Sequence, residues 1–258
     1  MSRLLAIAAL LAALAVACGG DGATPAPGAT SPAAAETKPS AEPTATPPAG
    51  ASEANVEPVS FETKDGLRID GQLYTTPGPK RKAVILAASF LRPKGWEPLA
   101  RDLAARGIAA LTFTMPRYVD TGESRDLALA DDDMETAVRF LQSRDYPLIY
   151  LAGEFEAGTV ALRVAARLDL AGVVTASARI SSTSGSTIVF DARQDVVSVT
   201  EPKLFLAGQD SLSPAVVDTL MQLAPQPKQS WVADSPAMGS QIIEIPEARR
   251  LIIDFISR

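Results

Sequence analysis

The residues whose types and spacing bear on chemistry centre on one corner, residues 148–158. Residues 148–151 are apolar and are followed by small residues, a pattern typical of a buried strand that turns sharply into a helix. Gly153 and Ala157 flank position 155 at the small-x-nucleophile-x-small spacing that presents one reactive side chain above a sheet. Here that position is Phe155, and a phenyl ring cannot act as a nucleophile. The corner is therefore predicted to keep the shape of a catalytic site without its reactive group.

The sequence also lacks the partners that a nucleophile needs. Its 258 residues include no histidine and a single cysteine, Cys18. A serine is a weak nucleophile unless an adjacent base takes its proton, and that base must in turn be held in place by an acid. Because no segment of the chain can supply an imidazole, acyl transfer by a serine–histidine pair is excluded.

The N-terminal residues resemble a bacterial lipoprotein signal. Arg3 precedes an apolar run over residues 4–16, which has the length of a signal-peptide core and is too short to span a bilayer. Cys18 ends the sequence LAVAC, which resembles a lipobox. The resemblance implies a signal peptide over residues 1–17 and a membrane partner reached through lipid on Cys18, which places the protein outside the cytoplasm on the cell envelope. A secretory signal with an incidental cysteine is the alternative.

Composition divides the rest of the chain into a tether and a domain. Residues 18–55 are rich in Pro, Ala and Thr and have no apolar periodicity, so we expect a disordered tether. Residues 56–258 are enough for one domain with a sizeable core. The formal net charge of −6 makes nucleic acid an unsuitable partner.

Strands and helices alternate through residues 56–258. The apolar runs AVILAAS, IAALTFT, LIYL, AGVVTAS and PKLFLAG are separated by helical patterns, which predicts an α/β fold with a mostly parallel sheet of about eight strands and helices on both faces. Asp65-Gly66 predicts a two-residue hairpin, so the second strand should be antiparallel. Residues 181–186 are expected to form a polar loop. No insertion is long enough for a lid domain.

Three consecutive aspartates, residues 131–133, stand at the start of a predicted helix. The helix dipole favours negative charge there. We interpret them as a solvated helix N-terminus and not as a metal site, and the sequence predicts no cofactor.

Four phrases carry a family resemblance: AVILAASFLRPKGWEPLARDLAARGIAALTFTMPRYVDTGES, LIYLAGEFEAGTVALRVAAR, LFLAGQDS and DSPAMGSQII. From about residue 60 to residue 258 the chain resembles the α/β-hydrolase fold, in particular small lidless esterases and dienelactone-hydrolase-like proteins. The resemblance implies a nucleophile at the corner, an acid after the LFLAG strand, a histidine near the end, and a His-Gly pair after the third strand.

Carried over by position, most of these residues are replaced. The resemblance puts the nucleophile at Phe155, the acid at Asp210 and the histidine at Met238, while the His-Gly pair falls on Ala88 and Ser89. The Asp, Arg and two Gly positions of the run after the fourth strand hold Thr114, Pro116, Arg117 and Val119. Only the acid is retained, so the chain resembles a degenerate member of the family.

Carboxylates and backbone amides remain near the corner. The oxyanion donors would be the amides of Glu156 and of the loop near Phe90, but a carboxylate on Glu156 opposes an oxyanion there. Glu154, Glu156 and Asp210 should lie at the carboxyl edge of the sheet, where α/β proteins bind ligands. Ser89 has no base and is not expected to act as a relocated nucleophile. The candidate pocket comprises Ser89, Phe90, Glu154, Phe155, Glu156, Asp210 and Met238.

Three hypotheses follow. The first is a lipid-anchored pseudoenzyme that binds a small molecule or another envelope protein. The second is a carboxylic-ester hydrolase with residual or relocated chemistry, using Glu154 or Glu156 with Asp210 and possessing no serine nucleophile. The third is an envelope domain that has a structural role and no ligand.

Overall fold

The computed structural model describes residues 54–258 except 89–91, 119–126, 185 and 210–211. The predicted signal peptide, Cys18 and nearly all of the predicted tether lie outside the described residues. So do Ser89, Phe90 and Asp210.

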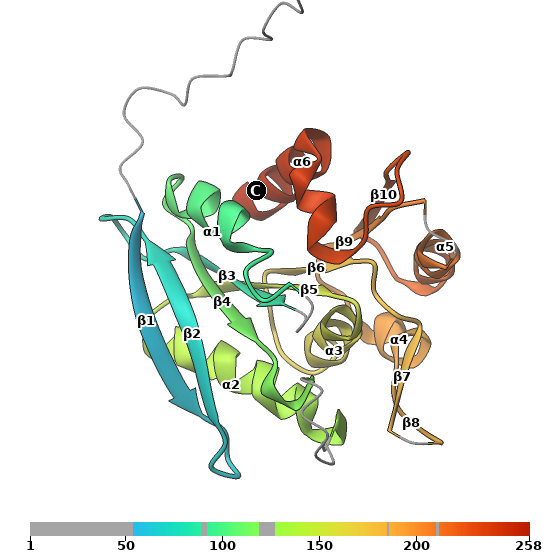
Figure 1. Cartoon of the computed structure of the whole chain (residues 1–258), viewed down its shortest axis with the longest axis horizontal. Helices are drawn as coiled ribbons and strands as arrows, with labels where there is room; N and C mark the ends of the chain where they lie inside the picture. Colours follow the sequence, from blue (N-terminus) through green and yellow to red (C-terminus); the bar gives the residue numbers. More distant parts are fainter. Residues whose placement is uncertain (1–53, 89–91, 119–126, 185, 210–211) are drawn as a thin grey trace, which may run out of the picture. The chain divides into compact units, whose positions relative to one another are not determined.

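An eight-stranded sheet runs through the domain in the order β1-β2-β4-β3-β5-β6-β9-β10 (Figure 1). β1 and β2 are antiparallel, as are β2 and β4, and every other neighbouring pair is parallel. The strands are β1 (Asn55–Glu62), β2 (Arg68–Thr75), β3 (Lys82–Ala88), β4 (Ala109–Thr114), β5 (Leu148–Glu154), β6 (Gly172–Ala176), β9 (Lys203–Ala207) and β10 (Lys228–Val232). The prediction of a mostly parallel sheet of about eight strands with an antiparallel second strand is confirmed.

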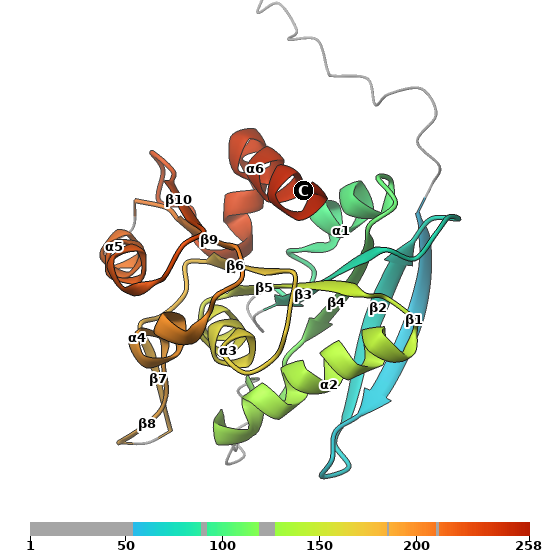
Figure 2. The ribbon, with the colours of Figure 1, turned by 180° about the vertical axis from the view of Figure 1, so that it is seen from behind.

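Helices cover both faces of this sheet, which Figures 1 and 2 show from opposite sides. α1 (Glu97–Ala104) and α6 (Pro246–Ser257) pack on one face. The other face is covered by α2 (Ala130–Ser143), α3 (Glu156–Ala165), α4 (Ala192–Asp195) and α5 (Ser213–Leu223). The central strand β3 is buried on both sides from Ala83 to Ala88, which explains its continuous apolar sequence. The described residues also form four short 3-10 helices: η1 (Pro116–Tyr118), η2 (Leu127–Leu129), η3 (Val196–Ser198) and η4 (Gly239–Glu244).

Local turns differ from the predictions in two places. The last pair of the β1–β2 ladder is Glu62 with Arg68, so the loop has five residues and the predicted two-residue hairpin is wrong. Thr63 organises that loop, because its backbone N–H donates to the carbonyl of Leu67 at 2.9 Å. The Ser-rich segment is not a loop either: β7 (Ser181–Ser184) pairs with β8 (Thr187–Asp191) in a separate two-stranded sheet. Two strands that pair only with each other tolerate polar side chains that a central strand would not.

Two of the three aspartates at the start of α2 are buried, which corrects the prediction of a solvated helix N-terminus. Asp133 is fully buried and its carboxylate accepts a hydrogen bond from Arg117 Nε at 2.9 Å. Burial raises the pKa of Asp133 to about 6. Asp131, also buried, pairs with Arg167 at 2.8 Å. Arginines from other elements therefore compensate charges that the sequence had suggested were exposed.

Two general searches of the described residues gave negative results. No three side chains of aspartate, glutamate or cysteine within them come together as a metal site. Within the same residues, no helix combines the length and apolar character needed to cross a bilayer.

Candidate functional site

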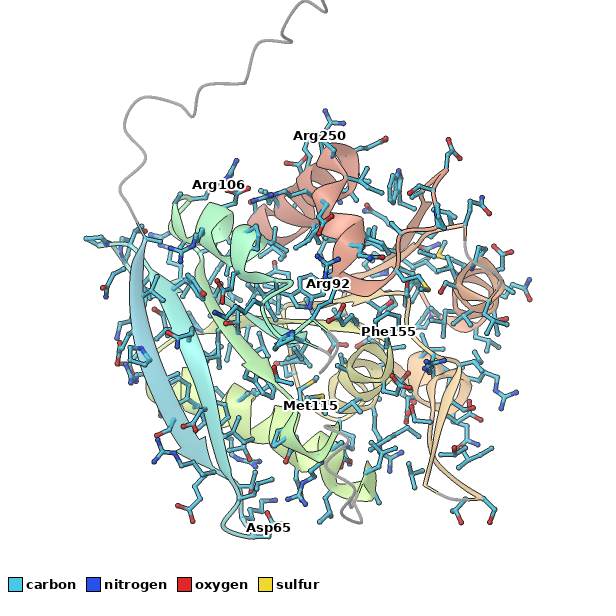
Figure 3. All side chains as sticks on the ribbon, viewed as in Figure 1. Asp65, Arg92, Arg106, Met115, Phe155 and Arg250 are labelled. Carbon is cyan, nitrogen blue, oxygen red and sulfur yellow. The ribbon has the colours of Figure 1, made fainter. Side chains whose placement is uncertain are left out.

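The corner between β5 and α3 has the strained backbone of a nucleophile elbow. Phe155 adopts φ 49° and ψ −122°, a conformation that costs a residue with a side chain about 1–3 kcal/mol. Its N–H donates to the carbonyl of Ala176 at 3.1 Å, and its own carbonyl accepts the N–H of Gly158 at 3.1 Å. Figure 3 shows Phe155 at this corner, beside the start of α3.

The small residues around Phe155 are required by close backbone approach. A Cβ added to Gly153 would lie 2.5 Å from the backbone C and O of Ala157 and 2.7 Å from the N of Gly158. None of these backbone atoms can move without unwinding the first turn of α3. The small residue at position 153 of the sequence pattern therefore has a steric cause.

The turn that begins with Met238 closes over the corner. Gly239 has φ +54°, and a Cβ on it would lie 2.6 Å from Cε2 of Phe155. Its N–H donates to Ser177 Oγ at 3.2 Å. Glu154, only 1% exposed, accepts a hydrogen bond from the backbone N–H of Ser240. The positions that the resemblance gives to the nucleophile and to the histidine thus lie beside each other.

Glu156 occupies the first position of α3 and forms an ion pair with Arg179. The distance from Arg179 Nε to Glu156 Oε1 is 2.5 Å. Burial raises the pKa of the Glu156 carboxyl, while its own backbone N–H and Arg179 act in the opposite direction. That N–H is the expected oxyanion donor, and it belongs to the same residue that carries this carboxylate.

A cavity of about 460 Å³ opens beside the corner. Phe155 and Met238 both line it, together with apolar side chains that include Ile180 and Val216. Among the described residues that line it, Arg179 alone is charged. Leu212 also lines the cavity and is 67% exposed. The volume and the largely apolar wall are those of a small-molecule site.

The predicted site residues are distributed as follows. Phe155 and Met238 line the cavity, whereas Glu154 and Glu156 contact its surroundings and are not part of its wall. Glu154 is buried at the end of β5. The three remaining candidates, Ser89, Phe90 and Asp210, lie outside the described residues.

Sequence reasoning missed Ser177 and Arg179. Both follow β6, and Ser177 has a positive φ of 51°. Polar residues directly after a buried strand reach the carboxyl edge of the sheet, where ligands bind. The segment Ser177-Ala178-Arg179 after the predicted strand AGVVTAS was thus an available signal.

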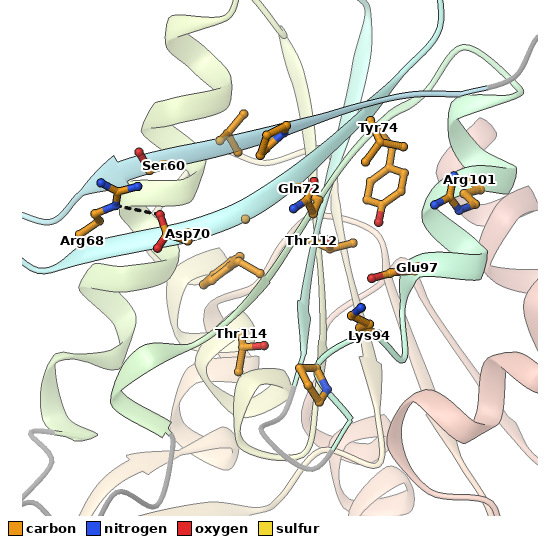
Figure 4. Close-up of a pocket in the computed structure, with 16 residues that line it drawn as sticks. Ser60, Arg68, Asp70, Gln72, Tyr74, Lys94, Glu97, Arg101, Thr112 and Thr114 are labelled. Carbon is orange, nitrogen blue, oxygen red and sulfur yellow. Dashed lines mark hydrogen bonds and ion pairs between the residues drawn. The ribbon is translucent and has the colours of Figure 1, made fainter.

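A second cavity, of about 600 Å³, lies between the β1–β2 pair and α1 (Figure 4). Its charged side chains have both signs, and Arg68 pairs with Asp70 at 2.8 Å. Arg101 stacks over the ring of Tyr74, with 5.4 Å between the guanidinium carbon and the ring centroid. Neither Phe155 nor Met238 lines this cavity, so it is separate from the corner site.

Comparisons with known proteins agree with this geometry at the level of the fold. No family model matches the chain, and no curated protein matches it. The dienelactone hydrolase of Anabaena variabilis superposes with a TM-score of 0.63 at 19% identity, over 79% of this chain and 95% of that one. An esterase domain from Rhodothermus marinus gives a TM-score of 0.61 at 18% identity, over 78% and 95%. An esterase of Pyrococcus furiosus gives 0.64 at 16% identity, over 80% and 91%. The described domain therefore has an α/β-hydrolase-like fold, and esterases and a dienelactone hydrolase are among the solved structures that share it.

Proposed function

We propose that this chain is a non-catalytic binding protein built on the α/β-hydrolase fold, and that it binds a small apolar molecule in the cavity beside Phe155. The observation that supports it most is the retention of the elbow geometry around a residue that cannot react. Phe155 keeps the strained backbone of a nucleophile position, and its ring and Met238 line a cavity of about 460 Å³.

The chemistry of the corner argues against ester hydrolysis. The chain contains no histidine, so no imidazole can take a proton from any hydroxyl or water. Glu156 carries a carboxylate on the same residue whose amide would stabilise an oxyanion. Negative charge at that position disfavours the transition state of acyl transfer.

A relocated hydrolase using Glu154 or Glu156 gains no support from the site. Glu154 is buried and takes part in packing the Ser240 turn, and Glu156 is paired with Arg179. Neither carboxylate lines the cavity, so neither is placed to act on a water beside a bound ester.

Hydrolysis of a panel of p-nitrophenyl esters by the full chain tests the absence of catalysis. We expect a rate equal to that of buffer, and no labelling by a fluorophosphonate probe. Turnover that disappears in the Glu156→Gln variant would overturn the proposal in favour of a carboxylate-based hydrolase.

Binding is tested separately, by the thermal shift of the full chain with small apolar probes such as octanamide. A ligand that binds only the folded state raises the melting temperature. We expect this shift to vanish in Val216→Arg, which places a charge in the cavity wall, and to persist in Val197→Arg, where an exposed valine outside the cavity is replaced. A protein that none of the probes stabilises would instead have a structural role.

We also propose that the domain is held at the cell envelope by lipid on Cys18, with residues 18–55 as the tether. The support is the LAVAC sequence after an apolar run of signal-peptide length. Mass spectrometry of the mature N-terminus tests it. A diacylated Cys18 is the expected result, and Cys18→Ser should release the protein from membranes. An unmodified Cys18 in membrane-free protein would refute this part of the proposal.

A further inference from the structure

We infer that the ligand of the corner cavity is a monocarboxylate with an apolar chain, whose headgroup binds the guanidinium of Arg179. The inference rests on the proposed binding function and adds the chemical class of the ligand. The inference follows from three observations: the polarity of the cavity wall, the position of Arg179 in that wall, and the ion pair between Arg179 and Glu156.

The first observation is the distribution of polarity in the wall. Ile180, Val216, Phe155 and Met238 make most of it apolar, and a ligand gains binding free energy for each CH₂ group that it buries there. A chain of several methylene groups therefore supplies the bulk of the binding energy. A fully polar ligand would lose its hydration without compensation.

The second observation is the position of Arg179. It lines the cavity and has a half-exposed side chain, so its guanidinium is accessible to a ligand. A guanidinium presents five N–H donors in a fixed plane that matches the two oxygens of a carboxylate. Its ion pair with Glu156 is made through Nε. The remaining donors belong to the two Nη groups.

The third observation is that Glu156 already provides an internal example of the interaction. A carboxylate lies 2.5 Å from Arg179, next to the cavity but not in its wall. A ligand carboxylate reaching Arg179 from the cavity side either shares the guanidinium with Glu156 or displaces it. In both cases the negative charge of Glu156 weakens the attraction for the ligand.

The inference predicts opposite effects for the two members of the pair. Arg179→Gln should weaken binding of octanoate about tenfold or more, since a hydrogen bond to a charged group contributes about 1.5 kcal/mol or more. Glu156→Gln should strengthen it, because the competing negative charge is removed. Binding of octanamide, which has the same chain and no charge, should change less than about threefold in either variant, since the lost interaction is ionic.

Isothermal titration of the full chain in phospholipid nanodiscs, with empty nanodiscs as the blank, measures these affinities. Arg193→Gln is the matched control, because Arg193 also has a half-exposed side chain in an ion pair but lies outside the cavity wall. Its octanoate affinity should equal that of the unmodified protein. The melting temperature of each variant shows whether it is folded. Arg179→Lys keeps the positive charge but lacks the planar set of N–H donors of a guanidinium, so it should give an intermediate affinity for octanoate.

The outcomes distinguish a failure of the carboxylate inference from a failure of the proposed binding function. Octanamide binding with octanoate no tighter, or octanoate binding that Arg179→Gln leaves unchanged, would overturn the carboxylate inference and leave the apolar binding function standing. If neither probe binds, both fail. Octanoate binding that is lost only in Arg179→Gln supports both.

Discussion

Replacing Gly239 with alanine tests whether the turn at Met238 is packed directly on the Phe155 ring. The new Cβ would meet Oε2 of the buried Glu154 carboxylate first, and it would lie 2.6 Å from Cε2 and 2.9 Å from Cζ of the ring, with φ at +54°. Gly107 is the control, since it has φ +77° but nothing within 4 Å of an added Cβ. Gly107→Ala therefore carries the backbone cost alone, about 1 kcal/mol, whereas Gly239→Ala adds an overpacking cost of about 1–3 kcal/mol.

For a domain of this size about 1 kcal/mol lowers the melting temperature by about 2–4 °C. We therefore expect a loss of about 3 °C for Gly107→Ala and about 6–12 °C for Gly239→Ala in a thermal melt followed by circular dichroism. Combining Gly239→Ala with Phe155→Ala should recover part of the loss, since the ring atoms nearest the new methyl group are gone. Equal losses in the two glycine variants, or strict additivity in the double variant, would refute the packing described for the corner.

Three further predictions concern other parts of the domain. Gly153→Ala should destabilise the fold by about 3 kcal/mol or more, because the added methyl group meets the backbone of Ala157 and Gly158. In urea titrations this loss of stability should exceed that of Gly158→Ala, whose added methyl group has the Cβ of Ala178 at 3.0 Å as its nearest contact. Similar losses in the two variants would contradict the steric account. Because burial raises the pKa of Asp133 to about 6 from 3.8, the native state holds a proton that the unfolded state has lost, so stability should fall by about 2 kcal/mol as pH rises from 4 to 7. Urea midpoints over that range should lose this slope in Asp133→Asn, and an unchanged slope would assign it to other groups. Lys203 is fully buried, and its Nζ donates to the carbonyls of Pro225 and Pro227 at 2.9 and 3.3 Å. In the same urea titration, Lys203→Met should lower the free energy of unfolding by about 1–3 kcal/mol, while the exposed control Lys64→Met should leave it almost unchanged. An equal effect of the two substitutions would show that the buried ammonium is not needed.

The elements of the sheet could be predicted because their signals are local. Residues 148–151 mark β5 and the apolar positions of residues 247–256 mark α6, since each element buries a face that its own sequence displays. The corner itself was visible from Gly153 and Ala157, because the close approach that excludes larger residues involves neighbours within a few positions along the chain.

The errors came from interactions between distant segments. Asp133 looks solvated in the sequence because nothing in its own helix indicates Arg117, which lies in η1 and reaches Asp133 because η1 packs against α2. Arg179 lies 23 positions after Glu156, and the two meet because β5 and β6 are neighbours in the sheet. The Asp65-Gly66 pair has the right composition for a tight hairpin, yet hydrogen bonds between Thr63 and Leu67 select a wider loop.

The peptide groups around Phe155 make the corner a branch point of the backbone network. The carbonyl of Phe155 accepts hydrogen bonds from the N–H groups of Gly158 and Thr159 in α3 and of Arg179 after β6. The N–H of Phe155 donates to the carbonyl of Ala176. These bonds can break only if the two strands and the helix separate together, so their amides should exchange with deuterium as one slow group. None of them involves the side chain at position 155. The side chain at position 155 can therefore differ while these backbone bonds stay in place, although its ring also packs on the turn at Gly239.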